Sequence, residues 1–187
     1  CEGDSAKAGI VSGLSRDDRN TIGIYPMKGK LLNVRGESLT KIGNNKEITE
    51  IKQILGLEHD KEYTSDDINK LRYGKVLFMT DQDLDGSHIK GLGLNLFDSL
   101  WNSLVLIPDF IGYMNTPILK ATKGSTIKQF YNEGEFELWK KDNNLKSWHI
   151  KYYKGLGTST SKEFKEYFAS KKIVTFDISS KKKIILV

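Results

Sequence analysis

Apolar residues along this chain form two kinds of pattern, which predict two kinds of element. The continuous run at 76–79 is typical of a strand buried on both faces of a parallel sheet. Apolar residues at intervals of three or four predict amphipathic helices. The longest such series follows this run, and we expect Ser87 to cap its helix. Its apolar positions are Ile89, Leu92, Leu96, Leu100 and Leu104.

The same reasoning predicts elements along the rest of the chain. Further helices are expected around 4–14, 48–55, 136–139 and 163–168. The second should end at Gly56, and the last should begin with a capping box of Thr160 and Glu163. Further strands are expected at 21–25, 110–119, 126–131 and 148–153, with a tail of two strands around 181–183. This alternation predicts an α/β fold, with a parallel sheet flanked by helices and a short β tail.

Composition narrows the class of protein. The 187 residues suit one domain, and 38% of them are hydrophobic, which is enough for a core. The single cysteine, Cys1, excludes a disulfide framework within the chain and fits an intracellular protein. The sequence contains no apolar run of membrane-spanning length and no signal peptide. The net charge of +5 mildly favours a polyanionic partner.

Three aspartates, Asp81, Asp83 and Asp85, alternate directly after the 76–79 run. Ligands of parallel sheets bind at the carboxyl edge, where this cluster is expected. Carboxylates this close repel one another unless a cation neutralises them, and oxygen ligands suit Mg²⁺ or Mn²⁺ better than Zn²⁺. If Glu2 follows another strand of the same sheet, it would join them as a fourth ligand or as a general acid/base.

Two other interpretations of the aspartate segment stay open at this point. It could be a solvated acidic turn, or the start of a calcium loop, since Asp-x-Asp-x-Asp-Gly matches an EF-hand. The EF-hand is opposed by Leu92, which occupies the twelfth loop position where a bidentate Glu is needed. It is also opposed by the strand-like segment before the aspartates, where an EF-hand requires a helix.

Basic residues gather in two glycine-containing loops, at 28–30 (Lys-Gly-Lys) and 154–157 (Lys-Gly-Leu-Gly). Glycine lets a backbone approach a phosphate closely, and lysine supplies the charge. His88 and Lys90 add basic groups at the start of the helix after the aspartates. Taken alone, each loop is typical of an ordinary flexible turn. Beside a cation-loaded acidic centre, however, these groups fit a nucleic-acid phosphodiester, while a plain basic nucleic-acid-binding domain remains the alternative.

Five segments in this order resemble the TOPRIM domain of type IIA DNA topoisomerases. They are 2–6 (EGDSA), 26–34 (PMKGKLLNV), 71–74 (LRYG), 80–91 (TDQDLDGSHIKG) and 152–159 (YYKGLGTS). The likeness covers nearly the whole chain and weakens after about Ile173, and Gln82 looks like the eukaryotic or eukaryote-virus form. Primases and nucleases with this domain share the acidic pieces but lack the 26–30 and 153–157 blocks.

The resemblance implies a Rossmann-like TOPRIM fold and specific roles for residues. Glu2, Asp81 and Asp83 would bind Mg²⁺, for which Mn²⁺ or Ca²⁺ can substitute in binding, and Asp85 would support a second ion. Glu2 would also be the catalytic general acid/base. The residues implied to contact DNA are Lys28, Lys30, Asn33, His88, Lys90, Lys154, Gly155 and Gly157. Lys28 stands where eukaryotic members usually carry Arg, so a bidentate contact is lost there.

The resemblance also implies a larger protein, a homodimer that cuts double-stranded DNA and passes a second duplex through the break, driven by ATP. Residues 1–172 would be the TOPRIM domain without its first strand. Residues 173–187 would lead toward a winged-helix domain that holds the nucleophilic tyrosine. ATP would bind in a separate ATPase domain, so this fragment should not cleave DNA alone. The expected location is the nucleus, or a cytoplasmic virus factory if the source is viral.

Overall fold

A computed structural model gives the positions of residues 1–176, so the turn expected around 181–183 lies outside the described residues. The helices are α1 (Gly3–Gly13), α2 (Arg16–Thr21), α3 (Leu39–Gly43), α4 (Lys46–Leu55), α5 (Ser65–Ile68), α6 (Leu84–Leu100), α7 (Asn102–Val105), α8 (Glu133–Lys141) and α9 (Ser161–Ala169). The strands are β1 (Val76–Phe78), β2 (Ile111–Met114), β3 (Leu119–Lys123), β4 (Thr126–Phe130), β5 (His149–Tyr152) and β6 (Ile173–Thr175). Two 3₁₀ turns, η1 (Leu145–Ser147) and η2 (Leu156–Thr158), complete the elements.

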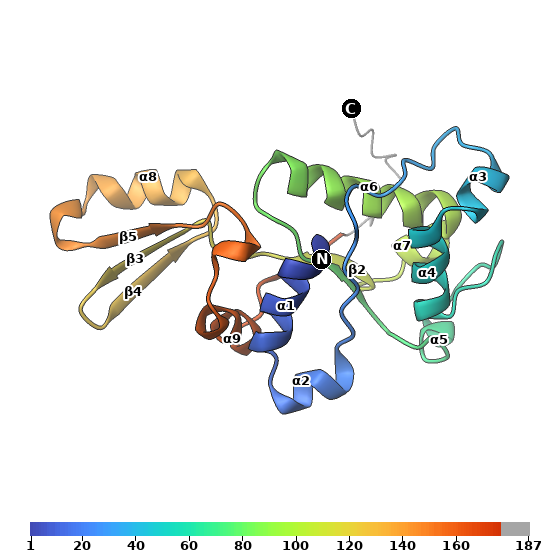
Figure 1. The fold of residues 1–187 in the computed structure, drawn as a ribbon, viewed down its shortest axis with the longest axis horizontal. Coiled ribbons are helices and arrows are strands. Elements are labelled where there is room, and N and C mark those ends of the chain that lie inside the picture. The colour runs from blue at the N-terminus through green and yellow to red at the C-terminus, as the bar shows by residue number, and fades with distance from the viewer. Residues whose placement is uncertain (177–187) are drawn as a thin grey trace.

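The main sheet has the order β1-β2-β6, in which β1 and β2 are parallel and β6 is antiparallel to β2. A separate parallel bridge joins Glu2 to Met27. Helix α6 crosses this part of the molecule, with Ile89 and Leu96 fully buried in the largest hydrophobic cluster (Figure 1). The predicted α/β class is confirmed. The expected boundary at 172 stays a prediction, although β6, beyond it, pairs within the main sheet.

A second sheet, β4-β3-β5, is wholly antiparallel and projects from the main body together with α8 (Figure 1). Its own core lies beneath α8 and consists of Leu119, Ala121, Phe130 and Phe136. The sequence predicted β4 and β5, but the strand expected at 110–119 covers β2 and shares only Leu119 with β3, so β3 was missed. It also did not predict a separate sheet. The short turn between β3 and β4, which includes Gly124 at φ +57°, requires antiparallel neighbours because a parallel pair needs a long crossover.

Local signals placed several helix ends correctly, but both ends of α6 differ from the prediction. The helix expected to run through Leu104 ends at Leu100, and Leu104 lies in α7. Gly56 ends α4 in the left-handed conformation (φ +77°), and Thr160 and Glu163 form the expected capping box of α9. Helix α6, however, begins at Leu84 rather than after Ser87. Asp83 is its N-cap, because the Asp83 side chain accepts a hydrogen bond from the Gly86 N–H at 2.8 Å. Since residues 84–92 are helical, a twelve-residue calcium loop cannot form here.

The segment expected as a strand at 21–25 lies at the side of a large apolar cavity. Thr21 ends α2, the backbone of Ile22 is extended, and residues 22–25 belong to no strand. The cavity, of about 650 Å³, is lined by this segment and by β1, and its walls include Ile22, Ile24 and Val76. Val76 is therefore only partly buried, although a strand buried on both faces was expected. Among residues 1–176, no helix is both long and apolar enough to cross a bilayer.

Candidate metal centre and nucleic-acid interface

The aspartate segment turns sharply at the carboxyl end of β1. Thr80 is buried there, and its hydroxyl donates a hydrogen bond to the Gly86 carbonyl at 3.1 Å. A Cβ at Gly86 would lie 1.9 Å from the Asp81 carbonyl oxygen, so only glycine allows the chain to fold back this closely. The turn presents the three aspartates at the start of α6.

Each aspartate carboxylate has a different partner within the protein. Asp81 Oδ1 accepts a hydrogen bond from the Leu156 N–H at 2.7 Å, and Asp83 Oδ1 caps α6. Asp85 forms an ion pair with Lys30 Nζ at 2.8 Å, and the Lys30 ammonium lowers the pKa of Asp85. These contacts come from three different parts of the chain: the 154–158 loop, the first turn of α6 and the 28–30 loop.

Glu2 joins this cluster from a distant part of the sequence. It is the N-cap residue of α1 and sits on the bridge with Met27, where Gly3 N–H donates to the Met27 carbonyl at 2.8 Å. Burial raises the pKa of Glu2, and the charges of Asp81, Asp83 and Asp85 raise it further. Glu2 Oε2 is buried, and no residue of the described chain forms a hydrogen bond with it.

This donor set fits a hard divalent cation. The four carboxylates offer only oxygen, and a buried carboxylate oxygen without a partner is costly unless a cation or a proton satisfies it. Within residues 1–176, the side chains as placed do not bring three acidic, histidine or cysteine groups close enough to enclose an ion. The metal roles predicted for Asp81, Asp83 and Asp85 therefore stay predictions.

The predicted basic residues make different contacts around the carboxylate cluster. Lys30 pairs with Asp85, and Lys28 lies in the same loop, where its backbone N–H donates to Glu47 Oε1 at 2.6 Å. Lys90 Nζ lies 4.6 Å from the centre of the Tyr113 ring. Burial lowers the pKa of Lys90, and the charge of Asp83 opposes that change.

The remaining predicted DNA contacts lie on the surface, with one exception. His88, Lys154 and Gly157 are exposed, and the exposed Asn33 accepts a hydrogen bond from the buried Asn95 side chain at 3.0 Å. The exception is Gly155, whose α-carbon faces the Asp81 carboxylate. Sequence reasoning missed the role of the Leu156 amide, because a backbone donor leaves no signal in the residue type.

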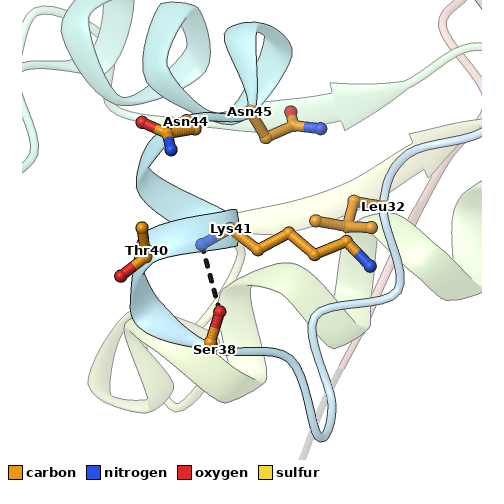
Figure 2. Close-up of a pocket in the computed structure, with 6 residues that line it drawn as sticks. All are labelled: Leu32, Ser38, Thr40, Lys41, Asn44 and Asn45. Atoms are coloured by element: carbon orange, nitrogen blue, oxygen red, sulfur yellow. Dashed lines mark hydrogen bonds between the residues drawn. The ribbon is translucent and has the colours of Figure 1, made fainter.

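A second hollow, of about 510 Å³, lies beside α3 (Figure 2). None of the four carboxylates lines it. Its lining contains no acidic residue and consists of Leu32, Ser38, Thr40, Lys41, Asn44 and Asn45. The Ser38 hydroxyl accepts the Lys41 N–H at 3.3 Å and so caps α3. This hollow is therefore no candidate for metal chemistry.

Comparison with protein families matches two segments of the chain. Residues 1–107 match the Toprim domain, and residues 114–186 match the C-terminal associated domain of TOPRIM. All four carboxylates lie in the first segment, whereas the Leu156 amide that contacts Asp81 lies in the second.

Individual proteins are also similar. DNA topoisomerase 2 of Arabidopsis thaliana is 51% identical over 173 residues, which cover 90% of this chain and 12% of that protein. DNA topoisomerase 2 of Acanthamoeba polyphaga mimivirus is 50% identical and covers 97% of this chain, which spans 15% of that protein. The DNA-binding, cleavage and re-ligation domain of Plasmodium falciparum topoisomerase II superposes with a TM-score of 0.84 at 50% identity, covering 90% of this chain and 23% of that one.

Proposed function

Since this chain belongs to the Toprim family and is homologous to DNA topoisomerase 2, we propose that it is the metal-binding part of a type IIA enzyme that cuts and reseals double-stranded DNA. The chain spans about one eighth of the length of the first curated relatives it matches. The nucleophilic tyrosine, the ATPase domain that binds ATP and the homodimer contacts are proposed to lie elsewhere in the whole protein. Its proposed location is the nucleus, or a virus factory for a viral source.

The observation that carries this proposal is the buried, unpartnered oxygen of Glu2 beside the aspartate turn. Glu2, Asp81 and Asp83 would hold one Mg²⁺, and Asp85 would support a second. A bound Mg²⁺ supplies charge stabilisation to a phosphate oxygen during cleavage. Because its pKa is raised, Glu2 holds a proton more readily than an exposed glutamate, which suits a general acid/base at the 3′ oxygen.

The basic residues around the cluster would bind the DNA backbone. Lys30 and Asp85 are half or more exposed, at 50% and 68%, so their ion pair is weak and Lys30 can turn to a phosphate at little cost. The Glu47 carboxylate accepts a hydrogen bond from the Lys28 backbone N–H, which holds the 28–30 loop in place and leaves both lysine side chains free of this contact. Lys28, Asn33, His88, Lys90 and Lys154 are proposed as further contacts.

The test uses the whole enzyme with Asp81→Asn and Asp83→Asn combined. Asparagine is a good N-cap and retains an acceptor oxygen, so the fold should persist. We expect Mg²⁺-dependent DNA cleavage to be abolished while most ATP hydrolysis remains. Asp98→Asn, which changes a carboxylate of α6 that pairs with Arg35 instead, is the matched control and should cleave normally. Retained cleavage in the double variant would refute the metal assignment.

A further inference from the structure

The loop at 154–158, which we call the glycine loop, reaches from the antiparallel sheet to the acidic cluster. Its Leu156 N–H donates to Asp81 Oδ1 at 2.7 Å, across 75 positions of sequence. The Leu156 side chain is only 2% exposed and packs in the cluster that contains Ala6, Ile10 and Phe164. The amide is therefore held in place by a buried anchor and is not a chance contact of a mobile loop.

Gly155 brings the loop backbone directly against the same carboxylate. A Cβ at this position would lie 2.3 Å from Asp81 Oδ2 and 2.8 Å from Asp81 Cγ. The backbone of Gly155 is extended (φ −175°), a conformation that any residue adopts. Glycine matters here because a side chain at 155 would displace the Asp81 carboxylate. Gly157, two positions on, has open space around its α-carbon.

Both ends of the glycine loop are fastened to the rest of the domain. The Gly155 carbonyl accepts hydrogen bonds from the Thr158 N–H at 3.1 Å and from the Thr158 hydroxyl at 2.7 Å. Before the loop, the Tyr153 hydroxyl donates to Glu163 Oε1 at 2.5 Å on α9. After it, the hydroxyls of Ser159 and Tyr167 lie 3.1 Å apart. These contacts give the Leu156 amide a fixed direction.

We propose that Gly155 and Leu156 are positioning residues, which set the orientation of the Asp81 carboxylate for the metal. This inference rests on the proposed function, because it assigns Asp81 to the metal centre. Without a fixed donor, repulsion from the neighbouring carboxylates would turn Asp81 away from them. The amide opposes that rotation, and the α-carbon of Gly155 closes the space into which the carboxylate would otherwise move. The second family segment therefore completes the acidic site of the first.

The test measures Mn²⁺ affinity by calorimetry in the absence of DNA. Gly155→Ala forces the Asp81 carboxylate to move, and it should bind Mn²⁺ about tenfold more weakly, as expected when a group that orients a ligand is lost. Gly157→Ala is the matched control and should bind as the wild type does. In the Asp81→Asn background, Gly155→Ala should cause no further loss. Thermal melting checks that the variants fold.

Unchanged affinity in Gly155→Ala would overturn the inference, as would an equal loss in both glycine variants. A second measurement needs no loop variant and covers the case in which Gly155→Ala fails to fold. In amide NMR spectra, Asp81→Ala should shift the Leu156 proton upfield, while Asp85→Ala should leave it in place. No shift would also overturn the inference. The proposed function fails separately, if Asp81→Asn with Asp83→Asn leaves Mn²⁺ binding unchanged.

Discussion

Glu163 is the best-connected buried charge in the part of the chain that the structure describes, and its removal should destabilise the domain. The residue is 7% exposed. Lys151 Nζ lies 3.0 and 2.8 Å from its two oxygens, and the Tyr153 hydroxyl and the Thr160 N–H also donate to it. These contacts join the antiparallel sheet to α9 and thereby hold the chain on both sides of the glycine loop.

The magnitude follows from the pKa of this carboxyl. Burial raises the pKa, but the Lys151 ammonium, the Tyr153 hydroxyl and the Thr160 amide outweigh burial and bring it from 4.5 to about 2. At about 1.4 kcal/mol per pH unit, this difference corresponds to a contribution of up to about 3 kcal/mol. Because the folded-state pKa is depressed, this stability is fully present above about pH 4.5 and is lost as the pH falls toward about 2.

Glu163→Gln should therefore lower the melting temperature at pH 7 by roughly 6–12 °C, at about 2–4 °C per kcal/mol for a chain of this size. The assay is thermal unfolding followed by circular dichroism, repeated from pH 7 to pH 3. The difference in melting temperature between wild type and variant should stay constant above about pH 5 and become smaller below it. The matched control is Glu166→Gln, since Glu166 is about one-third exposed and pairs with Lys120 at 3.1 Å. It should shift the melting temperature by about 2 °C or less. The reasoning would be refuted if this difference did not become smaller in acid, or if Glu166→Gln lowered the melting temperature as much as Glu163→Gln does.

Three further substitutions test the packing of α6 and the surface charge. Gly93→Ala would place a Cβ 2.1 Å from the Phe78 ring and should lower the free energy of unfolding, measured by urea titration, by about 1–3 kcal/mol. Gly91 has open space around it in the same helix, so Gly91→Ala should leave this free energy unchanged or raise it by up to about 1 kcal/mol. Equal costs would contradict this account of α6. Lys30→Ala removes only the exposed pair with Asp85 and should change the unfolding free energy by less than about 1 kcal/mol. In fluorescence anisotropy, it should weaken DNA binding and reduce the salt slope by about 1, and an unchanged slope would remove Lys30 from the interface.

The elements that could be predicted from the sequence are those whose signals are local. The apolar run at 76–79, the Thr160 capping box and Gly56 each determine an element end through neighbouring residues. The start of α6 was misplaced because Asp83 and Ser87 are both good N-cap residues. Which of them caps the helix depends on the turn that is held by the hydrogen bond from the Thr80 hydroxyl to the Gly86 carbonyl. Local propensity alone could not decide between these two residues.

The second sheet could not be derived from strand propensity, because pairing depends on the length of the connections. The turn at Gly124 was the available signal, since strands joined by two residues must be antiparallel. At the site, the resemblance implied that Glu2 lies near the aspartates. In the structure, the charges of Asp81, Asp83 and Asp85 do act on Glu2 and raise its pKa. The contact between Asp81 and the Leu156 amide had no such signal.

The acidic site is consequently not a property of the first family segment alone. Residues 1–107 contain all four carboxylates, but the group that fixes Asp81 comes from the second segment, at 114–186. That group is held by Leu156, which is buried between the segments, and by the Glu163 contacts near the loop. A perturbation of the antiparallel sheet can therefore reach the acidic cluster without changing any carboxylate. For this reason, an experiment on the acidic site needs both segments in one chain. The site includes residues on both sides of the gap between 107 and 114.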